Sequence, residues 1–206
     1  MFYDQSDEDW ICASAASIGK AITQAQAKAV VAAINVAAND PDVLAMLPKA
    51  DTSSAIHRAQ SLLQLERAGI AKDLAVAIYE RDGTPDANFP YPDAAGVLRR
   101  LHNAGAKVAV VSDVHFDLRA IFDQYGLREY IDAWVFSFQH GVQKPDPTMF
   151  RLALDALEAA PDEALMVGDR AERDGGSTDA GIAALILPAV PPGANRGLGV
   201  VERFLG

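Results

Sequence analysis

Cysteine is almost absent from this sequence: Cys12 is its only one, so no disulfide can form within the chain. Such scarcity is typical of proteins in a reducing compartment, and the predicted location is cytoplasmic. No apolar run reaches the roughly 20 residues that a membrane-spanning helix needs. The first nine residues are acidic where an export signal is basic, so no export signal is predicted.

Positive charge is also scarce, since 18 lysines and arginines face 28 aspartates and glutamates and the formal net charge is -10. That balance repels phosphate backbones and anionic lipid surfaces, so neither nucleic acid nor a membrane is expected as a partner. A small phosphorylated metabolite stays compatible with the composition, because a pocket can be locally positive. The sequence says nothing about oligomeric state.

What the chain does contain begins with an alanine-rich helical block, predicted as a unit over residues 8–89. One long helix is expected from Trp10 to Ala38, because apolar residues recur there at spacings of three and four. Further helices are predicted at 53–68 and 72–79. The apolar face predicted for the long helix consists of Ile18, Ile22, Ala25, Ala29, Ala33 and Val36.

Residues 90–206 have a different sequence pattern, in which short runs rich in β-branched residues alternate with helical patterns. This alternation predicts an α/β fold with a doubly wound parallel sheet, for which the helical block is a cap. The expected strands are 107–112, 133–137, 164–168 and 183–187, and the expected helices are 93–103, 116–125 and 148–159.

Polar residues follow three of these strands, at the sheet edge where open α/β folds bind ligands. Ser112 and Asp113 follow the first strand, Lys144 comes after the second, and Asp169 and Asp174 come after the third. A hydroxyl and an ammonium can hold a phosphate, and two carboxylates in a glycine-rich loop can hold Mg²⁺.

Each of these residues also has a purely structural interpretation. A serine at the end of a strand is often a turn or capping residue, and Asp174 can cap a helix. Asp146 and Pro147 suit the first turn of a helix, which leaves Lys144 unexplained. The combination in this order favours a functional site over three unrelated turns.

The order Ser112, Lys144-Pro145 and Gly168-Asp169-x-x-x-x-Asp174 resembles the second, third and fourth motifs of the haloacid dehalogenase superfamily. The resemblance implies that Ser112 and Asp113 bind substrate and that Asp169 and Asp174 hold Mg²⁺. It also implies that Lys144 steadies the phosphoryl group and that Lys144 and Asp169 serve catalysis. The form of the last motif points to phosphatase chemistry rather than to carbon–halogen cleavage.

One part of the family pattern is not found. Members open with a buried strand that ends in Asp-x-x-Gly-Thr, whose first aspartate attacks phosphorus and forms an aspartyl-phosphate. Asp4 is not preceded by an apolar strand or followed by Gly-Thr, and Asp82-Gly83-Thr84 lies in a charged loop. We therefore expect the first core strand to precede residue 1, so that Met1 is not the natural start.

Three functions are weighed on this basis. The first is a phosphatase that needs the absent strand, and the second is an inactive pseudoenzyme that binds or regulates; an upstream Asp-x-x-Gly-Thr separates them. The third, an unrelated nucleotide-binding or receiver domain, is disfavoured because no Gly-x-Gly-x-x-G or P-loop follows a strand. In the cap, His57, Arg58, Gln64 and Arg67 are expected at the surface, and His115 is expected to be a solvated loop residue.

Overall fold

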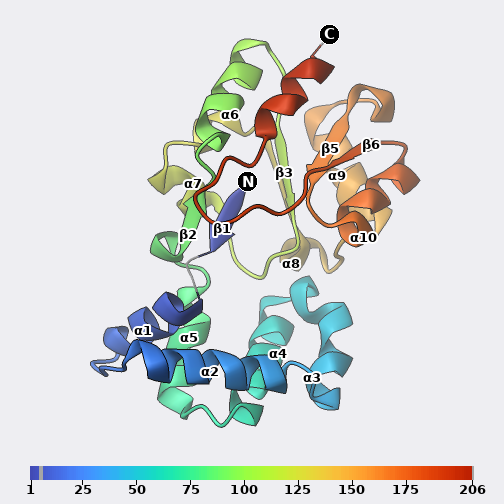
Figure 1. Ribbon diagram of the computed structural model, residues 1–206. Coiled ribbons are helices and arrows are strands. Elements are labelled where there is room, and N and C mark those ends of the chain that lie inside the picture. The colour runs from blue at the N-terminus through green and yellow to red at the C-terminus, as the bar shows by residue number, and fades with distance from the viewer. Residues whose placement is uncertain (5–6, 206) are drawn as a thin grey trace.

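The computed structural model describes residues 1–4 and 7–205, and Figure 1 shows a body of helices beside a body that contains the strands. The early part of the chain forms the helical body, which lies below the strands in this view. A 3-10 helix, Leu47–Thr52, joins two of its helices. The α-helices are α1 (Asp7–Ser17), α2 (Gln24–Ala37), α3 (Pro41–Met46), α4 (Ser54–Arg67) and α5 (Lys72–Arg81).

The single long helix predicted from Trp10 to Ala38 is wrong, because α1 and α2 are separate helices. Gly19 adopts a left-handed φ of 73° just after α1, which a side chain would disfavour. A capping box then starts α2: Gln26 N–H donates to the Thr23 hydroxyl at 3.2 Å, and Thr23 N–H donates to the Gln26 side chain at 2.8 Å.

The apolar face predicted for this stretch is also wrong at several positions. Ala25, Ala29 and Val36 are exposed, whereas Ala27 is fully buried. Because alanine is so frequent here, its spacing alone does not single out one face. The partly buried residues of α2 that pack around Ala27 are Val30, Val31 and Ile34.

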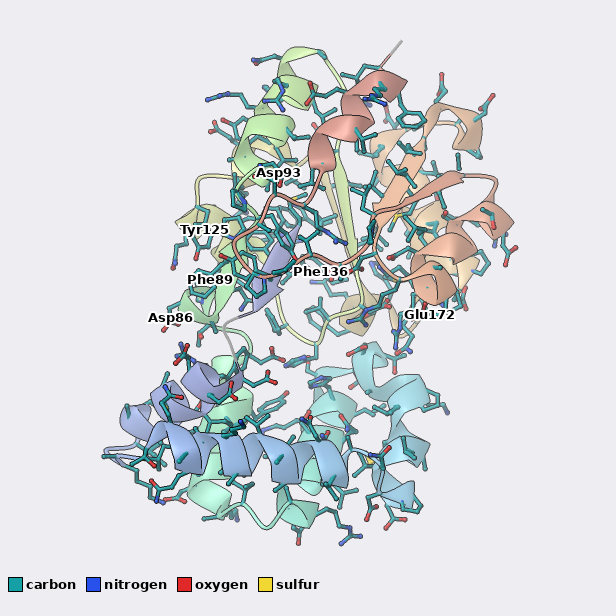
Figure 2. The ribbon with its side chains drawn as sticks, in the orientation of Figure 1. Asp86, Phe89, Asp93, Tyr125, Phe136 and Glu172 are labelled. Carbon is teal, nitrogen blue, oxygen red and sulfur yellow. The ribbon has the colours of Figure 1, made fainter. Side chains whose placement is uncertain are left out.

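A short antiparallel pair that the sequence did not predict joins the two bodies. Strand β1 (Phe2–Asp4) pairs with β2 (Asn88–Pro90), so the chain start meets the segment that follows α5. The Tyr125 hydroxyl donates to the Asn88 carbonyl at 2.9 Å and fastens β2 to the strand-containing body. Figure 2 shows Tyr125 and Phe89 at this junction.

Two parallel strand pairs make up the sheet. Strand β3 (Ala109–Ser112) pairs with β4 (Ala133–Phe136), and β5 (Leu165–Gly168) pairs with β6 (Ala183–Ile186). Hydrogen bonds between the two pairs are absent in the described parts of the chain. The α-helices of this body are α6 (Ala94–Asn103), which precedes β3, and α7 (Arg119–Gln124), α8 (Ser137–His140), α9 (Pro147–Leu157) and α10 (Ala171–Asp174), which lie between the strands in the chain.

Helix α9 packs against both strand pairs and so holds them together. Phe150 and Leu154 of α9 cluster with Val111 of β3 and Met166 of β5. The helix starts as expected, with the Asp146 carboxylate accepting from Thr148 N–H at 2.9 Å and proline in the first turn.

Burial differs between the strands in a way that is unusual for a doubly wound sheet. Every residue of β3 and of β5 is only partly buried, whereas β4 is buried at three of its four positions. Inner strands of such a sheet are normally covered on both faces and flanked on both edges. β3 and β5 are thus less covered than β4, although β6, with two exposed residues, is covered least.

No single helix in the described ranges is both long and apolar enough to cross a membrane, although α2 and the bent segment Pro41–Thr52 together pass by length and composition.

Phe122 anchors the core that lies under β1. Its ring is 2% exposed and lies 4.8 Å from the ring centroids of both Phe2 and Trp134. We expect Phe122→Ala to lower the free energy of unfolding by about 3–5 kcal/mol, because it removes a buried ring and leaves a cavity. Urea unfolding measures this change. The control Phe204→Ala, at a ring that is 59% exposed, should change stability by less than about 0.5 kcal/mol, and equal losses would contradict this account.

Candidate active site

The rim at the carboxyl ends of β3 and β5 brings together most of the residues singled out by sequence. The Lys144 Nζ donates to Asp174 Oδ1 at 2.6 Å, and the Lys144 backbone N–H donates to Asp113 Oδ1 at 2.8 Å. Ser112 ends β3 beside Asp113 and is partly buried. Asp169 follows β5, with its carboxylate 53% exposed. The loops after β3, β4 and β5 thus converge on one point.

The ion pair between Lys144 and Asp174 is largely buried. The side chains are 12% and 3% exposed, and the second carboxylate oxygen of Asp174 accepts from the N–H groups of Asp169 and Arg170 at 2.9 and 3.0 Å. Burial raises the pKa of Asp174, but the hydrogen bond and charge of Lys144, with the two N–H groups, outweigh it and lower the pKa overall. Asp174 is therefore ionised at neutral pH.

Two glycines let the loops approach this closely. A Cβ on Gly168 would lie 2.1 Å from Asp174 Oδ2, and a Cβ on Gly176 would lie 2.5 Å from the Pro145 carbonyl oxygen. Both distances are shorter than real atoms allow. The glycines of this motif are therefore needed for contact between the loop after β5 and the Lys144 segment.

Arg173 is a rim residue that sequence reasoning missed. Its guanidinium donates to Asp113 Oδ2 at 2.8 Å and lies 3.7 Å from Asp51 Oδ2 of the helical body. In the sequence Arg173 lies between Asp169 and Asp174, and this position is the only sequence feature that could have indicated its place at the rim. Arg173 therefore links the loop after β3 to the cap.

Arg196 was also missed, because it lies in a loop without periodic pattern. Its side chain is 5% exposed, lies 3.6 Å from Asp169 Oδ2, and donates to the carbonyls of Leu187 and Pro188. Burial lowers the pKa of the Met1 amino group, and the nearby charge of Arg196 lowers it further. The chain start and a buried guanidinium thus share the space next to Asp169.

The cap is hydrogen-bonded to the core at two places, the loop that follows Ser112 and the start of α8. The Ser137 hydroxyl donates to the Asp51 carbonyl at 2.6 Å, and the Ser54 hydroxyl donates to the His115 carbonyl at 2.5 Å. His115 is 7% exposed, so the prediction of a solvated loop residue is wrong. The cap covers it: the His57 ring stacks on the His115 ring with 3.6 Å between centroids.

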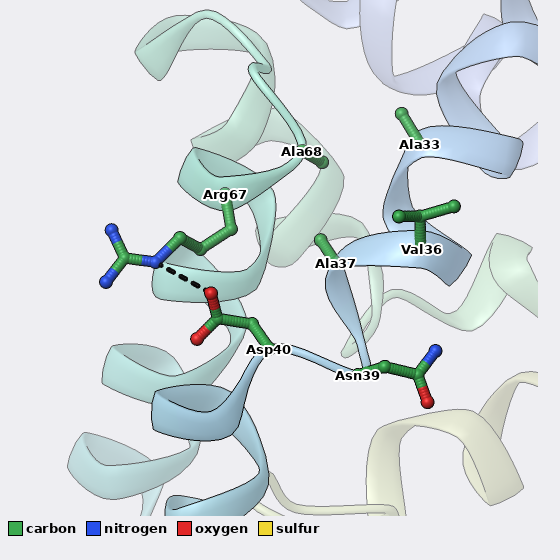
Figure 3. A pocket seen from close by; sticks show the side chains of 7 residues that line it. All are labelled: Ala33, Val36, Ala37, Asn39, Asp40, Arg67 and Ala68. Carbon is green, nitrogen blue, oxygen red and sulfur yellow. Dashed lines mark ion pairs between the residues drawn. The ribbon is translucent and has the colours of Figure 1, made fainter.

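Other cap residues named from the sequence lie away from this contact. Arg58 and Arg67 are exposed and pair with Glu80 and with Asp40 and Asp42, whereas Gln64 is partly buried and donates to the Ile34 carbonyl. Figure 3 shows a pocket of about 500 Å³ beside Arg67. Its lining holds none of the rim residues and consists of Ala33, Val36, Ala37, Asn39, Asp40, Arg67 and Ala68.

The donor set at the rim fits magnesium in kind, because Asp169 and Asp174 offer hard carboxylate oxygens. Asp169 exposes its carboxylate, whereas both oxygens of Asp174 already accept hydrogen bonds. Asp169 is thus the residue that offers an open ligand position, and Asp174 supplies charge and holds the loop.

Comparison with known proteins gives a consistent family. Residues 3–176 match the family described as haloacid dehalogenase-like hydrolase. Phosphoserine phosphatase of Thermus thermophilus is 35% identical over 112 residues, which cover 53% of this chain and 45% of that protein. The (S)-2-haloacid dehalogenase 1 of a Pseudomonas species is 31% identical over 114 residues, covering 55% and 47%. The matched segments thus span about half the length of these relatives.

Solved structures share the fold. A crystal structure described as a dehalogenase superposes with a TM-score of 0.66 at 20% identity, covering 92% of this chain and 83% of that one. A HAD phosphatase from Thermococcus onnurineus gives 0.60 at 18% identity, covering 97% and 87%. At these identities the likeness concerns the fold alone, and it confirms the predicted α/β core with a helical cap.

Removing the charge of Asp174 should lower the stability of the fold, because the Lys144 ammonium would then be buried without its partner. We expect Asp174→Asn to lower the free energy of unfolding by about 3–5 kcal/mol in denaturant titrations at neutral pH. Asp169→Asn is the matched control in the same loop. Its carboxylate is half-exposed, so its removal should cost less than about 1 kcal/mol.

The pH dependence of the Asp174 effect has a fixed sign. Because folding lowers the pKa of this carboxyl, its contribution to stability is present above the ordinary value of 3.8 and is lost as pH falls through the lower folded pKa. The stability difference between the parent protein and Asp174→Asn should therefore shrink only in acid. A difference that grew as pH fell would contradict the ion pair.

The close contact between Gly176 and the Pro145 carbonyl can be tested by comparing alanine substitutions at Gly176 and at its neighbour Gly175. Gly176→Ala places Cβ on the Pro145 carbonyl and should cost about 1–3 kcal/mol in thermal or urea unfolding. Gly175→Ala meets no atom within 4 Å at a helical φ of -63°, so it should be neutral or stabilise by up to about 1 kcal/mol. Equal effects of the two substitutions would refute the packing described here.

Proposed function

The chain belongs to the haloacid dehalogenase-like hydrolases, and from this premise we propose that it is the greater part of a magnesium-dependent phosphatase. The observation that carries the proposal is the rim, where Lys144 and Asp174 are locked together beside the exposed carboxylate of Asp169. Several relatives are phosphatases by name, including a phosphoserine phosphatase and a phosphoglycolate phosphatase from Aquifex aeolicus. We infer a small phosphorylated metabolite as substrate and the cytoplasm as location.

Each rim residue has a separate role in binding the phosphoryl group. Ser112 offers its hydroxyl and Asp113 follows it in the substrate-binding loop, where Arg173 and the Lys144 N–H fix the Asp113 carboxylate. Lys144 supplies positive charge next to the phosphoryl oxygens. Asp169 holds magnesium, with Asp174 beside it, and a bound magnesium ion neutralises charge on the phosphoryl group.

The nucleophile is proposed to come from a strand ahead of Met1. The supporting observation is that β3 and β5 are only partly buried and do not pair with each other, as expected if a strand between them were lacking. The Met1 amino group lies close enough to Asp169 and Lys144 for their charges to affect its pKa. A preceding segment would thus reach the rim directly.

In the proposed reaction, an aspartate of that strand attacks phosphorus. An oxygen–phosphorus bond forms at the carboxylate, the bond to the leaving alcohol oxygen breaks, and the leaving oxygen takes up a proton from solvent. Water then attacks the phosphorus of the aspartyl-phosphate and gives up a proton to solvent, which releases inorganic phosphate and restores the carboxylate. Lys144 and Ser112 hold the oxygens of the phosphoryl group through both steps.

A pseudoenzyme remains the second candidate, favoured by one observation. In the described residues, each rim aspartate lies within ion-pair distance of a cation: Asp113 near Arg173, Asp169 near Arg196 and Asp174 near Lys144. Without a further aspartate, the rim binds phosphate and magnesium but has no group to attack phosphorus. This chain would then act as a binding or regulatory protein.

The deciding experiment adds a strand of roughly a dozen residues, ending in Asp-x-Asp-Gly-Thr, before Met1. We expect the extended protein to hydrolyse p-nitrophenyl phosphate and phosphoserine with magnesium, and to lose activity when the first added aspartate becomes asparagine. Ser112→Ala in the extended protein should lower kcat by about 10²–10³-fold. The control Ser17→Ala, at an exposed serine of α1, should leave kcat unchanged.

The native protein offers an independent check through its intact mass. A mass above the 21.9 kDa of this chain by about one strand and loop would support the phosphatase. An extended protein that folds and binds magnesium but hydrolyses no phosphate ester would overturn it in favour of the pseudoenzyme.

A further inference from the structure

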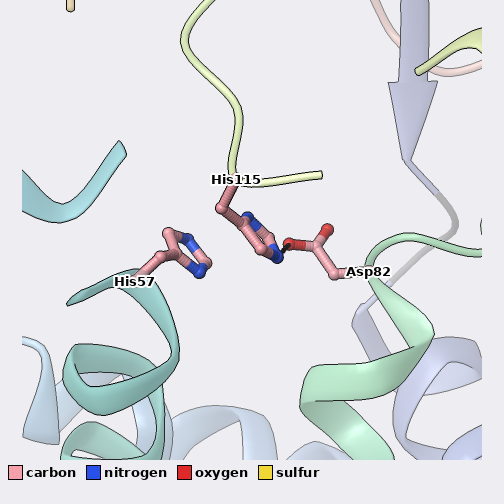
Figure 4. Close-up of side chains that lie close together, drawn as sticks. All are labelled: His57, Asp82 and His115. Atoms are coloured by element: carbon pink, nitrogen blue, oxygen red, sulfur yellow. Dashed lines mark ion pairs between the residues drawn. The ribbon is translucent and has the colours of Figure 1, made fainter. Parts of the chain in front are cut away.

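A cluster of two histidines and one aspartate lies where the cap meets the core, separate from the Lys144–Asp174 rim. His57 comes from α4, Asp82 directly follows α5, and His115 lies in the loop that follows Ser112 (Figure 4). One ligand atom from each lies within 4.8 Å of the other two. His115 Nε2 is 3.6 Å from Asp82 Oδ2, and Figure 4 shows these two atoms facing each other.

Packing holds the cluster in place from several sides. The His115 side chain is 8% exposed, and its ring touches those of His57, Tyr79 and Phe116. The His57 Nδ1 lies 3.4 Å from the Ser61 hydroxyl, and a second nitrogen lies 3.9 Å from Asp51. His115 Nε2 therefore lies within ion-pair distance of the Asp82 carboxylate in a buried setting, held there by rings from both the cap and the core.

Burial favours the neutral form of both imidazole rings, which is the form that binds a metal ion. Burial lowers the pKa of His115, and the neighbouring His57 lowers it further, to about 4. Burial also lowers the pKa of His57, although Asp51 opposes the change. Neutral imidazole is the form that binds divalent transition metals, so no proton has to leave at neutral pH before an ion binds.

We propose that His57, Asp82 and His115 form a binding site for a divalent transition-metal ion of the zinc type, which ties the cap to the loop after Ser112. Two imidazoles and one carboxylate are a common ligand set for such ions, and they differ from the all-oxygen set that suits magnesium. The proposal concerns a second metal, at a second place, and it does not depend on the phosphatase reaction.

The geometry needs one adjustment to hold an ion. Zinc at 2.0–2.2 Å from each ligand would set the ligand atoms about 3.3 Å apart, so the distance between His115 and Asp82 is already nearly right. The two rings stack 7° from parallel, so their nitrogens do not yet point to one centre. Binding of one ion by both rings therefore requires His57 to leave the stack, so that one of its nitrogens can face the Asp82 carboxylate.

Metal binding here has a consequence for the cap. Two of the ligands belong to cap helices or their ends, and the third is three residues beyond Ser112. An ion held by all three would add a link to the hydrogen bonds from Ser54 and Ser137 that already join cap and core. The bound ion should therefore favour the closed arrangement of the cap over the rim.

The test is titration of the whole chain with zinc chloride by calorimetry, and with cobalt chloride by visible absorption. We expect one ion per chain and cobalt bands of a nitrogen- and oxygen-ligated site. His57→Ala and His115→Ala should each weaken binding by at least about tenfold, and so should Asp82→Asn, which keeps the size of the side chain. Zinc should raise the melting temperature of the parent protein but not of these variants.

Controls separate this site from other metal-binding groups. His102→Ala and His140→Ala remove the two remaining histidines, and Cys12→Ser removes the only thiol; all three should bind zinc as the parent does. Asp169→Asn should abolish magnesium binding and leave zinc binding intact, so failure of one proposal is distinguishable from failure of the other. Zinc affinity unchanged in folded Asp82→Asn and His57→Ala proteins would overturn the site.

Discussion

The buried ion pair between Lys144 and Asp174 is the contact on which the rim depends. A charge taken out of water is tolerated only when it is paired and hydrogen-bonded, and here both conditions are met by groups from the loops after β4 and β5. The pair forces the loop after β5 against the Lys144–Pro145 segment. Gly168 and Gly176 have no side chain because none would fit in that contact.

The sheet around this rim is less complete than the rim itself. Helix α9 covers both parallel pairs, yet the two strands nearest the centre, β3 and β5, are only partly buried. The order of the rim comes from contacts between loops rather than from the sheet, because its ion pair and hydrogen bonds join segments that follow the strands.

The contacts described between the cap and the core are mainly polar. Serine hydroxyls reach backbone carbonyls, Arg173 lies between a core and a cap aspartate, and two neutral histidines stack on each other. Small interfaces of this kind permit relative motion of two bodies. A ligand or metal bound between the two bodies would contact both of them.

The sequence by itself determined the α/β class, the order of the four core strands and the rim residues Ser112, Asp113, Lys144, Asp169 and Asp174. These follow from hydrophobic period and from residues next to strand ends, both of which are local. The break between α1 and α2 has local signals, Gly19 and the capping box of Thr23 and Gln26, but the spacing of apolar residues across them predicts one continuous helix. Only the tertiary structure placed Arg173 and Arg196 at the rim and buried His115 against His57. Those contacts join residues far apart in the chain, and no local pattern records which distant side chains will meet.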